Sequence, residues 1–348
     1  MAYLTSLHAF KLENAVTKVD VKSNEKEGFR KQVLEWSGRD LNEQDEVKRE
    51  KELEGLKHNS NLEELAIRHF VGSNFPSWMI GGHLQNLVTL SLYHCTKCKT
   101  ISLGQLPCLR ELYIKGMQEL EEWPQDQYTS LCMLHVINCP KLRKLPNFMS
   151  DLRVLKLKRC DSLKALPKAP SLLFLILINN LVLEEWQEGS STTQYDEGNL
   201  AGQLRPTLNG PLELKLILSI QRCPKLESLP DEELPTALEC LMIGSCPMLN
   251  SLGAKETLKS LLFLKDLYVE DCPSIRCLPE EGLPPSLQHL KIHGCPLLIE
   301  ECQKEGAGAT EWPKIMNVPD LEIDSIKLSY TQLCQRKKYG FVDLFAVK

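Results

Sequence analysis

Cysteine is the residue type in this sequence with the greatest capacity for chemistry. The 348 residues include 14 cysteines, and thiolates bind zinc, form disulfides or act as nucleophiles. Cys95 and Cys98 have the spacing of a zinc-ligand pair, and Cys272 and Cys277 add two further thiols. One pair with this spacing is a weak indication of a metal site, because a structural zinc ion needs four ligands. A structural role is the simpler interpretation of these cysteines.

The other residue types that support catalysis form no recognisable site. No histidine or asparagine can be placed beside a candidate nucleophilic cysteine, and the chain has no Gly-x-x-x-x-Gly-Lys-Ser/Thr loop to hold a phosphate. His94, His135, His289 and His293 fall on or beside expected strands, where a surface histidine is a simpler interpretation than a ligand. The sequence therefore predicts no enzyme, no metal and no cofactor.

Most of the cysteines belong to copies of one repeated phrase. Residues 131–146 read Leu-x-x-Leu-x-Val-x-x-Cys-Pro-x-Leu-x-x-Leu-Pro, and the position of this cysteine recurs at residues 70, 95, 117, 139, 160, 180, 223, 246, 272 and 295. Successive positions are 20 to 26 residues apart, except for 43 residues between 180 and 223. This period and core are typical of leucine-rich repeats. We therefore predict an α/β solenoid, a leucine-rich repeat horseshoe with a parallel β-sheet on its concave face and a mostly irregular or short helical convex side.

The spacing also predicts what each repeat buries. In Leu-x-x-Leu-x-Leu the last two leucines are two residues apart, so both point inward from one strand while their neighbours face solvent. The cysteine or asparagine follows, where the chain turns inward and a small polar group can satisfy backbone groups. Seven of the fourteen cysteines occupy this position: Cys95, Cys139, Cys160, Cys223, Cys246, Cys272 and Cys295.

Charge and hydropathy exclude two classes of partner. The chain has 41 Lys and Arg against 46 Asp and Glu, a net charge of −5, so it has no overall basic field for nucleic acid. Its most apolar run, residues 172–183, is well short of the ~20 residues that span a bilayer. The first residues do not resemble a secretory signal, and no Asn-x-Ser/Thr site is present. We expect no nucleic acid or membrane partner and a cytoplasmic or nuclear location.

The strand positions that face solvent predict where a protein would bind. A basic patch is expected first along the chain, then an apolar patch, then an acidic one. The alternative is that the inserted loop at residues 188–211 covers the apolar patch. The candidate residues are, in that order, Lys115, His135, Lys156, Lys158 and Arg159; Leu173, Phe174, Ile176 and Ile178; and Lys265, Asp266, Tyr268, Glu270 and Asp271.

The chain divides into six expected segments. Residues 43–57 are strongly charged and are expected to form a helix with a solvated face. The polar, Gly- and Pro-bearing stretch in the long gap indicates an exposed loop. The segments are 1–60, degenerate N-terminal repeats with the charged helical stretch; 61–187, leucine-rich repeats; 188–211, the inserted loop; 212–302, leucine-rich repeats; 303–324, a closing segment; and 325–348, an atypical extension.

Several motifs resemble one family of repeat proteins. They are the repeated CPxL and LP phrases, LEGLKHNSNL at residues 53–62, GSNFPSW at 72–78, LEEW at 120–123 and 183–186, and GATEWPKIMNVPDLEID at 308–324. Together they are similar to the leucine-rich repeat region of plant intracellular nucleotide-binding leucine-rich repeat disease resistance proteins of the coiled-coil class. The similarity covers residues 1–324 and is weakest before residue 53.

The resemblance implies a non-enzymatic recognition module in plant innate immunity. Such a module senses a pathogen effector or a host protein that the effector modifies, and in a full receptor it also contacts the nucleotide-binding switch. Because this sequence lacks that switch, we expect a fragment or truncated form. The alternative is a stand-alone adaptor or decoy without signalling activity. An extracellular receptor or a thiol or zinc enzyme has less support in the sequence.

Overall fold

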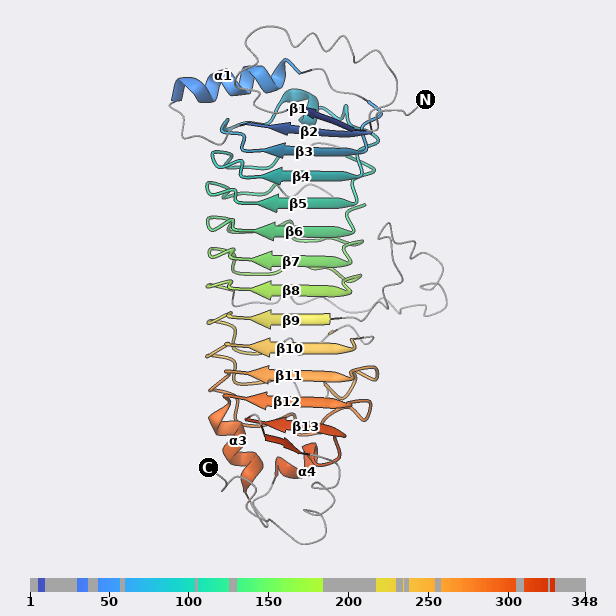
Figure 1. The fold of residues 1–348 in the computed structure, drawn as a ribbon, viewed down its shortest axis with the longest axis vertical. Helices are drawn as coiled ribbons and strands as arrows, with labels where there is room; N and C mark the ends of the chain where they lie inside the picture. Colours follow the sequence, from blue (N-terminus) through green and yellow to red (C-terminus); the bar gives the residue numbers. More distant parts are fainter. Residues whose placement is uncertain are drawn as a thin grey trace.

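The structure is a computed structural model that describes residues 6–9, 30–36, 43–56, 60–103, 106–124, 130–183, 217–229, 234, 238–253, 258–304, 310–324 and 326–328. In these residues, fourteen strands form one sheet whose strand order follows the sequence. The molecule is an elongated solenoid in which each turn adds one strand below the previous one (Figure 1).

The strands are short and evenly arranged. Every neighbouring pair is parallel except the last, β13 and β14, which is antiparallel. The predicted repeat solenoid with a parallel sheet is therefore confirmed. The strands are β1 (Ser6–Ala9), β2 (Lys31–Glu35), β3 (Glu64–Arg68), β4 (Thr89–Tyr93), β5 (Glu111–Lys115), β6 (Met133–Ile137), β7 (Val154–Lys158), β8 (Phe174–Ile178), β9 (Ile217–Gln221), β10 (Cys240–Gly244), β11 (Asp266–Glu270), β12 (His289–His293), β13 (Asp320–Ile323) and β14 (Ile326–Leu328).

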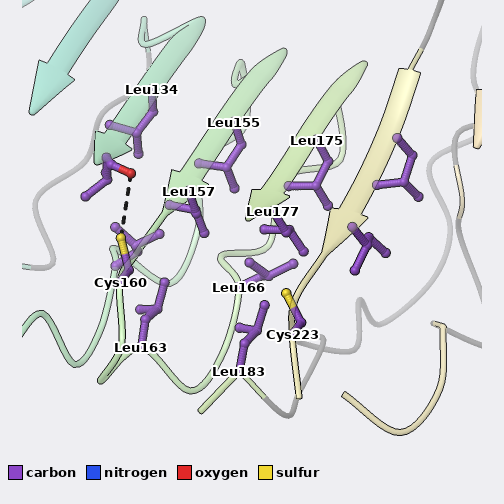
Figure 2. Close-up of a cluster of buried hydrophobic side chains, with 14 of the residues drawn as sticks. Leu134, Leu155, Leu157, Cys160, Leu163, Leu166, Leu175, Leu177, Leu183 and Cys223 are labelled. Carbon is purple, nitrogen blue, oxygen red and sulfur yellow. Dashed lines mark hydrogen bonds between the residues drawn. The ribbon is translucent and has the colours of Figure 1, made fainter. Parts of the chain in front are cut away.

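The predicted inward leucines form one continuous core. Leu134 of β6, Leu155 of β7 and Leu175 of β8 are register partners, and each is at most 5% exposed. Figure 2 shows them in a row behind the sheet, with Leu157 and Leu177 in the next row. A single strand cannot bury such side chains alone, so each turn depends on its two neighbours.

The side chain at the cysteine position is buried and hydrogen-bonds to backbone groups inside the solenoid. The thiol of Cys160 donates to the carbonyl of Val136 in the previous turn, 3.6 Å away (Figure 2). Asn180 replaces cysteine one turn later, where its Nδ2 donates to the Leu157 carbonyl at 3.2 Å and its Oδ1 accepts from the Cys160 N–H at 3.1 Å. Burial raises the pKa of Cys95 and of Cys139 to about 12. The predicted structural role of this position is confirmed.

A second repeated position, which the spacing did not reveal, lies just after each strand from β3 to β13. Its residue is left-handed, with φ between 45° and 57° at nine non-glycine residues among those described. Its N–H continues the parallel ladder, as when Asn138 donates to the Lys158 carbonyl at 2.8 Å and Arg159 to that of Ile178 at 3.0 Å. This ladder bond offsets the steric cost of the left-handed conformation. The nine residues are His69, His94, Asn138, Arg159, Asn179, Arg222, Ser245, Asp271 and Asp324.

Helix α1 (Glu43–Glu54) lies at the N-terminal end of the solenoid (Figure 1). The expected helix is present and has an exposed side that includes Lys48 and Lys51, but its other side is not solvated, because Leu53 is fully buried and Arg49 is 4% exposed. The Glu50 carboxylate accepts hydrogen bonds from the N–H groups of Ser73, at 2.7 Å, and Asn74, at 2.9 Å. The GSNFPSW motif therefore holds the helix against the repeats, and it leads into α2 (Ser77–Ile80).

The long gap in the repeat spacing interrupts the sequence but not the sheet. Strand β8 pairs directly with β9, with Leu175 opposite Leu218 and Leu177 opposite Ile220. The gap is therefore an insertion between two adjacent turns. The predicted loop at residues 188–211 lies outside the described residues.

The C-terminal end of the sheet is closed by short helices and an antiparallel strand. Helices α3 (Pro296–Gln303) and α4 (Trp312–Ile315) precede β13. Between them, the buried Glu311 accepts the Leu278 N–H at 2.7 Å and pairs with Lys314 at 2.8 Å. Strand β14 belongs to the predicted atypical extension, so the first residues of that extension join the sheet.

Candidate protein-binding face

The structure brings the five predicted basic residues together on the outward side of the sheet. His135 and Lys156 are register partners on β6 and β7, and Ile137 lies between Lys115 of β5 and Lys158 of β7. Arg159, which follows β7 in the left-handed conformation, is exposed. Positive charge therefore alternates with apolar surface across three strands.

The predicted apolar patch follows on β8. Phe174, Ile176 and Ile178 occupy its three outward positions and are partly buried. Leu173, predicted with them, lies one position before the strand and so outside its outward row; like Phe174, it is partly buried and packs against the core. Its N–H and that of Phe174 both donate to the Arg153 carbonyl at 2.8 Å.

Apolar residues of neighbouring strands extend the patch. Val154 of β7 is the register partner of Phe174, and Met242 of β10 lies two strands beyond Ile176. The spacing within one repeat does not show that these side chains belong to the patch. The strand register shows that they adjoin the same surface. The additional outward residues are Met133, Ile137, Val154, Ile217 and Met242.

The predicted acidic patch is partly neutralised by its neighbouring strand. Asp266 Oδ1 lies 2.6 Å from Nδ1 of His289. Lys291 Nζ lies 2.9 Å from Glu270 Oε1 and 3.8 Å from Glu322 Oε1. The expected acidic section is therefore a cross-strand network of ion pairs and hydrogen bonds. The network includes Lys265, whose Nζ lies 2.8 Å from Glu239 Oε2. Tyr268 occupies the outward position between Asp266 and Glu270. Asp271 comes directly after β11 and is exposed.

A cleft of about 480 Å³ opens on the sheet face at the ends of β2 to β6. Sequence analysis named three of its residues, Lys115, His94 and His135, without placing them in one site. The rings of His69 and His94 stack with their centroids 5.1 Å apart and their planes 6° apart. The Tyr113 ring meets the His135 ring edge-on at 5.0 Å. The cleft thus has walls of flat rings.

Two fixed cations and one carboxylate also line this cleft. The Arg68 guanidinium lies 5.7 Å from the centroid of the Tyr93 ring, and its Nη1 is 3.6 Å from Glu35 Oε2. That distance is too long for a direct hydrogen bond. Lys115 is the second cation. Burial, followed by the nearby positive groups His69 and Lys115, lowers the pKa of His94.

The glycine at position 116 is required by the stacked histidines. Gly116 has φ +71°, and a Cβ added there would overlap the His94 imidazole. Burial, followed by the charge of Lys156, also lowers the pKa of His135. The uncharged forms of these two rings are therefore favoured, while Arg68 and Lys115 are the fixed cations of the cleft.

The described part of the chain holds neither a metal-binding group of side chains nor a membrane-spanning helix. No group of three or more His, Cys, Asp or Glu side chains there is arranged to hold a metal ion. None of the helices described is both long enough and apolar enough to cross a bilayer. Cys95 and Cys98 instead direct their thiols to backbone carbonyls, those of Ile67 and Gly72.

The repeated turns and continuous parallel sheet define a leucine-rich repeat solenoid. Residues 1–117 match the family model described as R13L1/DRL21 LRRs. The chain is 28% identical over 158 residues to the putative disease resistance RPP13-like protein 1 of Arabidopsis thaliana, covering 33% of this chain and 15% of that protein. It is 36% identical over 87 residues to the putative disease resistance protein RGA4 of Solanum bulbocastanum, covering 24% of this chain and 9% of that protein.

These matches confirm the resemblance to the leucine-rich repeats of plant disease resistance proteins. The matched regions span only a small part of those long relatives. Among solved structures, the leucine-rich repeat domain of the type III effector XCV3220 (XopL) matches with a TM-score of 0.34 and 18% identity, covering 80% of this chain and 73% of that domain.

Proposed function

We propose that this chain is the non-enzymatic recognition module of a plant defence protein and binds another protein through its sheet face. The observation that carries the proposal is the apolar patch of β8, where Phe174, Ile176 and Ile178 occupy outward positions beside Lys156 and Lys158. Apolar surface with a charged rim is typical of protein interfaces. Repeat solenoids bind partners through such extended faces.

The relatives suggest the kind of partner. Because they are named as disease resistance proteins, we infer that the partner is a pathogen effector or a host protein that an effector modifies. Within a longer receptor, the nucleotide-binding switch would be a second partner. The proposed location is the cytoplasm or nucleus, without nucleic acid or membrane as a partner.

The test is a binding screen of the purified chain against secreted pathogen proteins and plant proteins. Each binder is then measured against the double variant Phe174→Glu, Ile176→Glu. The two introduced carboxylates should weaken binding at least tenfold, because the bound partner would remove them from water. Calorimetry measures the affinity, and circular dichroism confirms that the variant is folded.

Leu181→Glu is the matched control. Leu181 lies in the same turn, is 49% exposed, and follows β8 outside its outward row. This variant should bind like the unmodified chain. If the double variant is folded and binds as tightly as the control, the β8 patch is not the site. Binders that include neither a pathogen protein nor a target of one would contradict the defence role.

A further inference from the structure

The cleft at the ends of β2 to β6 has a small net positive charge. Arg68 and Lys115 carry two positive charges, and Glu35 is the one carboxylate of the lining. Arg68 Nε is a buried donor without a hydrogen-bond partner in the described part of the molecule. Lys115 is exposed, and Tyr93 lies between it and Arg68 in the strand register. An anion with one charge would balance these groups.

The same cleft offers flat and apolar surface beside the cations. The stacked rings of His69 and His94 form one wall, and Ile137 contributes an aliphatic side chain. Planar rings favour stacking with a partner's aromatic or planar side chain. The lining therefore combines one anion-binding position with one apolar position.

The dimensions suit an extended polypeptide. Strands in a sheet lie about 4.8 Å apart, so β3 to β6 span roughly 14 Å, and an extended chain covers that distance with about four residues. A ligand lying across the strands could therefore reach both Arg68 and Lys115.

We propose that this cleft binds an extended acidic segment of the partner protein, with a Glu or Asp carboxylate between Arg68 and Lys115 and a neighbouring apolar or aromatic side chain against the His69–His94 stack. The inference rests on the proposed function, since it assumes a protein partner, but its cations Arg68 and Lys115 lie on β3 and β5, away from Phe174 and Ile176 of β8. A carboxylate fits better than a phosphoryl group, whose charge of about −2 exceeds the net charge of the lining.

The experiment titrates the full chain with three short capped peptides. Their central sequences are Ala-Glu-Phe-Glu-Ala, Ala-Gln-Phe-Gln-Ala, and the first peptide with phosphoserine replacing each glutamate. Binding is followed by the NMR signals of the histidine rings, which report the cleft directly. We expect the Glu peptide to shift the signals of His69 and His94 and to bind at least tenfold more tightly than the Gln peptide.

Charge reversal locates the site. Lys115→Glu should reduce affinity for the Glu peptide at least tenfold, because it replaces one of the two fixed cations of the cleft. Lys164→Glu is the matched control, since Lys164 is equally an exposed lysine but lies in the turn after β7, away from the cleft. It should leave the affinity unchanged.

Three results would overturn the proposal. They are equal binding of the Glu and Gln peptides, no effect of Lys115→Glu, or tighter binding of the phosphoserine peptide, which would assign the cleft to phosphopeptides. The double variant of Phe174 and Ile176 should still bind the Glu peptide. If the Glu peptide does not bind while protein partners still bind through the β8 patch, the cleft assignment is wrong and the proposed function stands.

Discussion

At Asn180 the interior of the solenoid contains a polar side chain that is fully buried. Its amide makes two hydrogen bonds to backbone groups, while Cys160 one turn earlier makes a weaker thiol contact to the Val136 carbonyl. Both residue types are small enough to enter the turn. The position therefore selects a short side chain that can hydrogen-bond, and a reactive thiol is not needed for it.

Asn180→Ala tests this role. Removal of the amide leaves the Leu157 carbonyl and the Cys160 N–H without their partner, which should lower the free energy of unfolding by about 2 to 4 kcal/mol. Asn180→Cys introduces the residue found at this position in other turns and should lower the free energy of unfolding by less. Asn250→Ala, at an exposed position, should change stability by less than about 0.5 kcal/mol. Urea unfolding followed by circular dichroism measures all three, and equal losses for Ala and Cys would contradict the argument.

Among the elements, α1 shows how a charged sequence acquires a buried side. Its residues predict a solvated helix, yet its Glu50 and Glu54 carboxylates both hydrogen-bond to the GSNFPSW motif. The Trp78 indole N–H donates to the Leu53 carbonyl at 3.1 Å. The helix thus covers the turn that would otherwise be exposed at this end.

Glu50→Ala should detach α1 from the repeats. It removes the acceptor of two backbone N–H groups, so we expect a loss of about 1 to 3 kcal/mol and a lower melting temperature. Lys51→Ala, a change at an adjacent exposed position of the same helix, is the control and should have little effect. A melting temperature of Glu50→Ala equal to that of the control would show that the helix contributes nothing to the end of the solenoid.

At the scale of the whole molecule, each turn contacts only its neighbours, so stability is distributed along the solenoid. The C-terminal end depends on the buried Glu311, which accepts the Leu278 N–H and pairs with Lys314. A substitution at this end should therefore lower stability only locally. The stability of the middle of the sheet should not change.

Hydrogen exchange of Glu311→Ala tests this independence. The amides of β12 and β13 should exchange faster, because a buried N–H loses its acceptor and the closing segment opens more often. The amides of β5 to β7 should keep their protection. Glu301→Ala, which breaks only the exposed pair with Lys304, serves as the control. Uniformly faster exchange along the entire sheet would mean that the solenoid unfolds as one unit.

The sequence by itself determined the repeat, its inward leucines and the structural role of seven cysteines. These features depend on spacing within about 22 residues, because the alternation of side chains along a strand is a local property. The motifs also indicated the relationship to plant disease resistance proteins, and the spacing indicated which residues of each strand face outward.

Only the tertiary structure decided which outward residues meet. The cleft joins Glu35 to Ile137, residues about a hundred positions apart, and the acidic residues Asp266 and Glu270 are paired by side chains of the following strand. The left-handed position after each strand accepts residues as different as His94 and Asp271, so no residue type marks it. These features depend on the register between turns and on side-chain orientation, and the spacing within one repeat specifies neither.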